Sequence, residues 1–436
     1  MSVDSAITHR RIWRLAAPII LSNATIPLLG AMDTAVVGQL GEAAPIGAVG
    51  LGAVILTTLY WVFGFLRMGT SGLAAQAHGA GDEAECTAIL LRGLIAAGLA
   101  GLALTAAQQF LILGALRFSP ASPEVEELAR QYLVIRLWGA PATISIYAIT
   151  GWLVALERTG RVLAMQLLIN LINVVLDLWF VLGLGWGVRG VAFATLAAEW
   201  SGALFGLWLC REAFGPALAA AARRLWDRMA VRTMLAVNGD IMVRSVLLQL
   251  SFTSFIFLAA GEGDLTLAAN QILIQLLRVT DALDGIEFAA ESLVGQAVGQ
   301  RRPLEVRRAS RLTLCWLFAG AALLSLVYMA AGGAVIDLMA TDAAVRAEAR
   351  QFLPWLIVAP LIGAAGWGYD GIYIGATLTR LMRQIMILCV AIYAIAVVIL
   401  LPAFGNHGLW AALMCLYVSR GVLMWRSYPA VEARAA

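Results

Sequence analysis

Long apolar stretches alternate with short polar or turn-rich breaks along the whole chain. Each stretch holds about twenty residues, the length that a helix needs to cross a lipid bilayer. The breaks are mostly short, as expected between neighbouring antiparallel helices. The pattern predicts an all-α polytopic membrane protein with twelve spanning helices. They are expected near residues 12–38, 45–67, 88–116, 124–150, 161–184, 189–212, 231–260, 265–291, 309–334, 345–374, 381–402 and 407–427.

The composition supports a membrane protein and excludes several other classes. Of the 436 residues, 61% are apolar and 13% are charged, whereas about 25% of a soluble domain is charged. These values exclude a disordered chain, a collagen-like fibre and an ordinary soluble enzyme. The net charge of +3 is too small to indicate nucleic acid as a partner.

The chain carries no recognised cofactor, nucleotide or catalytic motif. Its five cysteines are far apart and have no metal-binding spacing. We therefore expect no cofactor, and we expect any energy that the protein uses to come from an ion gradient rather than from bound nucleotide. No metal is expected beyond Na⁺ as a coupling ion.

The first apolar run resembles a signal peptide at its start. Arg10, Arg11 and Arg14 precede it, but Pro18 and Pro27 interrupt it and no small-residue cleavage site follows. We interpret the run as a membrane helix broken at the two prolines.

Arginine placement gives an expected orientation. With twelve spans both termini share one side, and most arginines fall on that side. Arginines on the other side are Arg117, Arg130, Arg189, Arg346 and Arg350. By the positive-inside rule, both termini are expected in the cytoplasm.

Three short matches indicate an internal duplication. The segments 72–79, 151–159 and 187–190 resemble 292–299, 371–379 and 405–408 in the same order, each about half the chain apart. Each half then holds six spans and enters the membrane with the same orientation, as in transporters with parallel repeats. We expect an N-terminal lobe over 1–212, a cytoplasmic linker over 213–230 and a C-terminal lobe over 231–436.

Polar residues of the first half fall inside predicted spans, where a charge costs at least about 2.5 kcal/mol. Asp33 lies in the first span, and Asn173 and Asp177 share one face of the fifth because they are four residues apart. Thr195 lies in the sixth. If these helices meet, the oxygen atoms suit Na⁺, while two close carboxylates also suit a shared proton. A structural network between helices is the remaining alternative. Glu199, in the sixth span, has no obvious partner.

The second half carries a longer series of intramembrane charges. The eighth span holds Asp284, Glu287 and Glu291 on one helical face, together with Arg278 and Asp281. Asp240 and Arg244, four apart in the seventh span, are expected to form an ion pair. These groups and Asp370 either line a cation-attracting cavity or pair with arginines to stabilise packing. Glu291 lies near enough to the predicted interface to be solvated.

Several segments resemble the multidrug and toxic compound extrusion (MATE) transporters, and the DinF branch in particular. The matching segments are 27–38 around Asp33, Gly72 to Gly79 at a loop entry, 238–245 around Asp240, Asp284-Gly285 with Glu291, 370–377 beginning at Asp370, and 405–410. The resemblance covers nearly the whole chain.

The resemblance implies a V-shaped pair of six-helix lobes that exports cationic, amphipathic compounds in exchange for H⁺ or Na⁺. It assigns the coupling-ion site to Asp33, Asn173, Asp177 and Thr195, and helix bending to Pro18 or Pro27. It favours H⁺. It implies a monomer in contact with lipid, in the inner membrane of a bacterium.

Two other functions stay open at this stage. A lipid-linked oligosaccharide flippase of the same superfamily would need basic cavity residues, and this chain has more acids than arginines in its spans. A membrane-embedded enzyme would use Asp284, Glu287 and Glu291, but the duplication favours alternating access.

Overall fold

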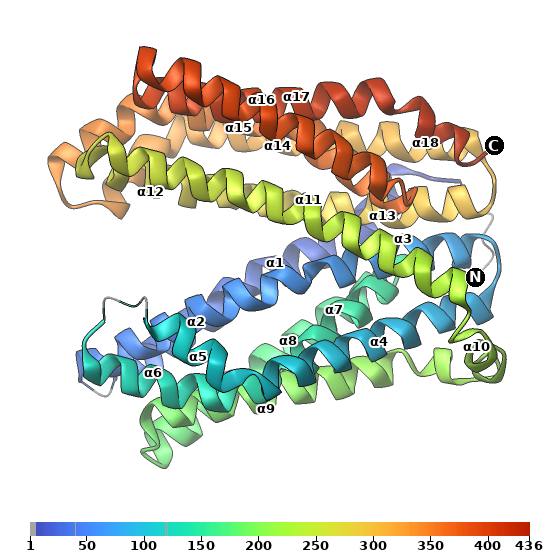
Figure 1. The fold of residues 1–436 in the computed structure, drawn as a ribbon, viewed down its shortest axis with the longest axis horizontal. Helices are drawn as coiled ribbons and strands as arrows, with labels where there is room; N and C mark the ends of the chain where they lie inside the picture. Colours follow the sequence, from blue (N-terminus) through green and yellow to red (C-terminus); the bar gives the residue numbers. More distant parts are fainter. Residues whose placement is uncertain (1–5, 40, 118, 120) are drawn as a thin grey trace. The chain divides into compact units, whose positions relative to one another are not determined.

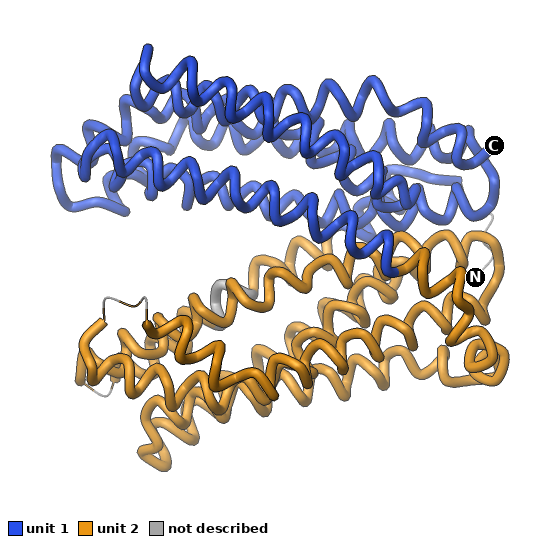
Figure 2. Tube along the Cα trace, in the orientation of Figure 1, with its two compact units in different colours: residues 1–16, 235–436 blue, residues 17–234 orange. Residues whose placement is uncertain are grey.

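The computed structural model describes residues 6–39, 41–117, 119 and 121–436, and of residues 26–29 only the backbone. It is helical, with no strand among the described residues. The helices form two compact units, unit 1 with residues 1–16 and 235–436 and unit 2 with residues 17–234 (Figure 2). Figure 1 shows their order along the chain.

The described part of the N-terminal half contains ten α-helices and four short helical segments of other types. They are α1 (His9–Gly38), α2 (Ala43–Trp61), η1 (Val62–Gly64), α3 (Phe65–Gly79), α4 (Glu83–Ala106), α5 (Gln108–Arg117), α6 (Pro123–Arg136), η2 (Leu137–Gly139), α7 (Ala140–Ala155), α8 (Thr159–Asp177), η3 (Leu178–Gly183), α9 (Gly187–Leu209), η4 (Arg211–Phe214) and α10 (Leu218–Arg224).

The C-terminal half continues with longer helices. They are α11 (Arg228–Gly261), α12 (Asp264–Leu277), η5 (Arg278–Leu283), α13 (Asp284–Gly299), α14 (Pro303–Met339), α15 (Ala343–Gly375), α16 (Thr379–Phe404), α17 (Asn406–Ser427) and α18 (Pro429–Ala433).

Eleven helical stretches among the described residues are long and apolar enough to cross a membrane. The eighth predicted span, 265–291, is not one of these eleven. It lies in the segment Asp264–Gly299, which η5 interrupts and which carries several charged residues. The all-helical polytopic class predicted from the apolar pattern is confirmed.

Two local expectations about helix continuity are wrong. Helix α1 runs unbroken through Pro18 and Pro27, since membrane helices tolerate proline where neighbouring groups satisfy the freed carbonyl. The side chain of Pro27 lies outside the described residues. The eighth span is not one continuous helix. The segment Gly72 to Gly79 forms the second half of α3 and leads into the turn at 80–81, as expected for a loop entry.

The break between α6 and α7 has a clear cause. Pro141 lacks an N–H, so the carbonyl of Leu137 loses its ordinary helical donor four residues on. The hydroxyl of Thr105 on α4 donates to that carbonyl instead, at 2.8 Å. Gly101 on the same face of α4 allows the close approach, because a Cβ there would overlap the backbone of Pro141. The break places Arg136 at the end of α6 inside unit 2.

Candidate functional site

The candidate coupling-ion site lies inside unit 2, where α1, α8 and α9 contribute buried polar side chains. Asp33, Asn173, Asp177 and Thr195 are all buried, and Asp177 and Asn173 are polar neighbours of Asp33. The structure therefore brings together the four residues that the sequence predicted. Asp177 is the last residue of α8 and precedes the π-helical segment η3, a local distortion that is frequent at functional sites.

Hydrogen bonds orient the amide of Asn173. Its Nδ2 donates to Thr195 Oγ1 at 3.1 Å, and that hydroxyl donates to the carbonyl of Val191 at 2.9 Å. Because the amide nitrogen is engaged, Asn173 Oδ1 faces away from Thr195. Asn173 Oδ1, Asp33 Oδ1 and both carboxylate oxygens of Asp177 have no donor among the described residues.

An ion pair that the sequence did not predict lies beside these acids. Arg136 on α6 donates two hydrogen bonds to Glu199 on α9, at 2.6 and 2.9 Å. Arg136 is close enough to interact electrostatically with Asp33 and Asp177. A Cβ at Gly139 would overlap Glu199 Oε2, so glycine is what makes room for this pair. Glu199, which had no expected partner, is thus the counter-ion of Arg136.

The acids of unit 1 have arginine partners of their own. Arg383 and Thr379 on α16 donate to Asp240. Arg244 and Arg420 both pair with Asp370, and all three side chains are buried. The predicted pair of Asp240 with Arg244 is wrong, because each of them finds a partner on another helix.

Two glycines bring α13 and α15 into close contact. A Cβ at Gly371 would overlap the backbone and side chain of Glu287, and a Cβ at Gly375 would lie 2.6 Å from the carbonyl oxygen of Glu291. Glu291 is fully buried, so the expectation that it is solvated is wrong. Asp281 is exposed, and Asp284 and Glu287 are half-buried. The predicted acidic face thus splits into several environments along α12–α13.

The segment 405–410, which resembles the MATE transporters, contributes two side chains to a buried hydrogen-bond network. Asn270 on α12 and Asn406 on α17 exchange two amide hydrogen bonds, at 2.7 and 3.2 Å. Trp410 Nε1 donates to Asn270 Oδ1 at 2.9 Å. This buried network ties α12 to α17.

Among the described residues, no group of three or more His, Cys, Asp or Glu side chains could hold a metal ion.

Comparison with known proteins agrees with this architecture. The MatE family model matches residues 18–179 and 241–400, one match in each half. The chain is 36% identical over 431 residues to the DNA damage-inducible protein F of Escherichia coli, covering 97% of this chain and 93% of that protein. It is 30% identical over 344 residues to "Probable multidrug resistance protein NorM" of Pseudomonas aeruginosa, covering 73% and 68%.

Solved structures match the same fold. An outward-facing multidrug resistance MATE family transporter superposes with a TM-score of 0.87 at 20% identity, covering 98% of this chain and 96% of that one. The Vibrio cholerae MATE transporter VcmN in its bent form gives 0.85 at 18% identity, covering 98% and 97%.

These findings define a duplicated, multi-pass helical transporter with six spans in each half. The chain belongs to the MatE family. The resemblance to the DinF branch is confirmed by the Escherichia coli relative, and the two-lobe MATE fold expected from the sequence is confirmed by the structural matches.

Proposed function

We propose that this transporter is an antiporter that exports cationic, amphipathic compounds across the inner membrane of a bacterium, and that its coupling cation binds at Asp33 and Asp177. The observation that carries the proposal is the pair of buried carboxylates with unpartnered oxygens in unit 2. Names such as "multidrug resistance protein" among the relatives support the substrate class.

Electrostatics supports a cation at this position. Two neighbouring carboxylates in a low-dielectric interior repel each other unless a proton or a metal cation lies between them. The nearest guanidinium, that of Arg136, is held by Glu199 in a bidentate pair. An incoming cation therefore does not have to displace an arginine. Asn173 Oδ1 supplies a further ligand for Na⁺, and Thr195 holds the amide in position.

Antiport requires the cation and the exported compound to favour different conformations. We propose that cation uptake from outside shifts the conformational equilibrium and releases the compound there. Bending of α1 at Pro18 or Pro27 would accompany this shift, and the half-buried Asp284 and Glu287 would contribute to the substrate cavity. We favour H⁺ as the coupling ion, with Na⁺ as the alternative, in a monomer with both termini in the cytoplasm.

The test is transport of a cationic dye into liposomes that hold the purified protein. A pH gradient and a Na⁺ gradient are imposed separately on wild type, on Asp33→Asn, and on the control Asp337→Asn. Asp337 on α14 forms an exposed pair with Arg350 on α15, far along the chain from the site. We expect one gradient to drive dye movement in wild type and in the control. We expect a loss of about 100-fold or more in Asp33→Asn, since the substitution removes the proposed ligand.

Two outcomes would contradict the proposal. Undiminished coupled transport in Asp33→Asn would remove this carboxylate from the mechanism. An absence of gradient-driven dye movement in folded wild type would favour the flippase alternative, which is then tested with a lipid-linked oligosaccharide as substrate.

A further inference from the structure

The linker between α9 and α11 carries an excess of positive charge that the protein does not neutralise. Arg224 pairs with Asp82 at 2.6 Å, and Glu212 pairs with both Arg158 and Arg161. Three further arginines are exposed and form no ion pair with any described residue, namely Arg223, Arg228 and Arg232. Arg228 and Arg232 are four residues apart in the first turns of α11, so they share one face.

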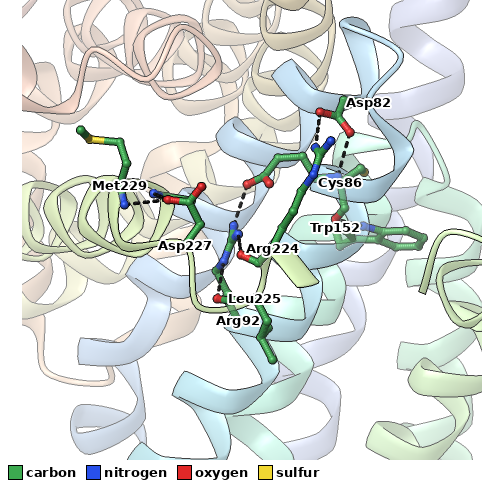
Figure 3. A network of polar contacts seen from close by, with 10 residues as sticks. Asp82, Cys86, Arg92, Trp152, Arg224, Leu225, Asp227 and Met229 are labelled. Carbon is green, nitrogen blue, oxygen red and sulfur yellow. Dashed lines mark hydrogen bonds and ion pairs between the residues drawn. The ribbon is translucent and has the colours of Figure 1, made fainter. Parts of the chain in front are cut away.

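The position of the linker is fixed by one arginine of α4 (Figure 3). Arg92 Nη2 donates to the carbonyl of Arg224 at 2.6 Å, and its Nε donates to the carbonyl of Leu225 at 3.1 Å. Its Nη1 donates to Glu85 at 2.6 Å. Arg92 is buried. Helix α10 is too short to be stable alone, and Arg92 caps its last carbonyls and holds it against α4.

The turn that follows α10 presents apolar side chains next to these arginines. Trp226 is 71% exposed and Met229 is 72% exposed. Asp227, the acid on this turn, is engaged in capping α11, since its Oδ1 accepts from the backbone N–H groups of Met229 and Ala230. The linker surface, formed by Arg223, Trp226, Arg228, Met229 and Arg232, therefore combines uncompensated positive charge with exposed apolar area at the start of a membrane span.

We propose that the linker surface binds the phosphate headgroup of an anionic phospholipid. Guanidinium groups bind phosphate oxygens in bidentate geometry, and tryptophan favours the headgroup level of a bilayer. A free phosphate would satisfy the arginines but would leave Trp226 and Met229 in water, whereas a lipid covers both. Arg92 acts as a positioning residue, because it holds the backbone that carries this surface. The inference does not depend on the coupling-ion site.

The test measures binding of fluorescent phosphatidylglycerol and fluorescent phosphatidylcholine to the full chain in neutral detergent. The variant combines Arg223→Gln, Arg228→Gln and Arg232→Gln. A charge-matched control changes three exposed arginines that also form no ion pair with described residues. They are Arg301, in the turn before α14, and Arg308 and Arg311 in the first turns of that helix. We expect wild type and control to prefer phosphatidylglycerol, and the linker variant to bind it about tenfold more weakly or worse, since each arginine near a headgroup contributes to affinity.

Two single substitutions separate the surface from general damage to the structure. Asp82→Asn keeps an oxygen that can cap Glu85 N–H but frees Arg224, so phosphatidylglycerol affinity should be equal or higher. Arg92→Gln should weaken phosphatidylglycerol binding several-fold and leave phosphatidylcholine binding unchanged, because it displaces only the charged surface.

Three results would overturn the proposal. Equal losses in the linker variant and in the control would mean that overall charge governs lipid preference. Weaker binding in Asp82→Asn would mean that the integrity of the α4–α10 contact governs it. Displacement of the lipid by inorganic phosphate at a similar concentration would mean that the site binds free phosphate.

Discussion

The acids of the two units are buried to a similar degree but differ in their partners. In unit 1, Asp370 contacts two guanidinium groups and Asp240 contacts a third. In unit 2, Asp33 and Asp177 lie beside each other, and the neighbouring Arg136 is held by Glu199. A buried carboxylate that already has a guanidinium partner has little to gain from a cation, whereas a neighbouring pair without one has much to gain.

This difference predicts that the acids have different roles in the two halves of the chain. The arginine-paired acids of unit 1 join α11 to α16 and connect α15 with α11 and α17. They are suited to holding helices together. The acids of unit 2 are suited to taking up and releasing an ion. Substitutions of the unit 1 acids should therefore mainly lower the free energy of unfolding. Substitutions of the unit 2 acids should mainly lower ion-coupled transport.

The largest effect on stability is expected for Asp370→Asn. The substitution removes the carboxylate that Arg244 and Arg420 share in a buried setting. Breaking a buried ion pair costs about 3–5 kcal/mol, so the free energy of unfolding in detergent should fall by that amount. The control Asp337→Asn breaks an exposed pair with Arg350 and should cost less than about 1 kcal/mol. Equal unfolding midpoints for the two variants would show that Asp370 does not stabilise unit 1.

A smaller effect on stability is expected for Glu199→Gln. The substitution would give the acids of unit 2 a guanidinium partner, as the acids of unit 1 already have. Arg136 would lose its carboxylate partner and become the nearest counter-ion of Asp33 and Asp177. The coupling cation would then compete with a guanidinium, and its apparent affinity in dye transport should fall about tenfold, or about 1.4 kcal/mol. The loss of unfolding free energy should stay at about 1–3 kcal/mol, because the neighbouring acids take over as partners of Arg136.

The matched control is Glu127→Gln, which breaks an exposed pair with Arg130 in the same unit. It should leave cation affinity unchanged. An unchanged affinity in Glu199→Gln would show that Arg136 does not reach the acids, and the contrast between the two units would then need another explanation.

The sequence predicted the fold class because apolar length predicts spans, and the four-residue spacing of Asn173 and Asp177 predicted a common helical face. The grouping of these two residues with Asp33 and Thr195 came from the resemblance to the MATE transporters and not from local spacing. The partners of the charges were not predictable in this way. Arg136 and Glu199 are 63 positions apart and come from different helices, so no local spacing connects them.

Local spacing was misleading for Arg244. Asp240 and Arg244 are four apart, which favours a pair within one helix, but each of them pairs with a residue of another helix. Arg420, the second partner of Asp370, is buried within α17. It is 50 positions from Asp370, so no local spacing connects the two.

The smallest effect on stability is expected for the ion pair of Asp82 with Arg224, which is exposed to solvent, unlike the buried acids compared above. Partial burial opposes ionisation of Asp82, but the backbone N–H of Glu85 and the Arg224 guanidinium outweigh it and lower the pKa of this carboxyl. The unfolded chain then takes up the proton at a higher pH than the folded one. The stabilisation is therefore complete above about pH 4 and is lost as the pH falls through the lowered folded value. At pH 7 wild type should be more stable than Asp82→Asn by less than about 1 kcal/mol. Thermal unfolding in detergent at pH 7, 5 and 3 should show that difference shrinking only in the most acidic sample, and a constant difference would mean that the capping hydrogen bond, and not the charge of Asp82, stabilises the start of α4.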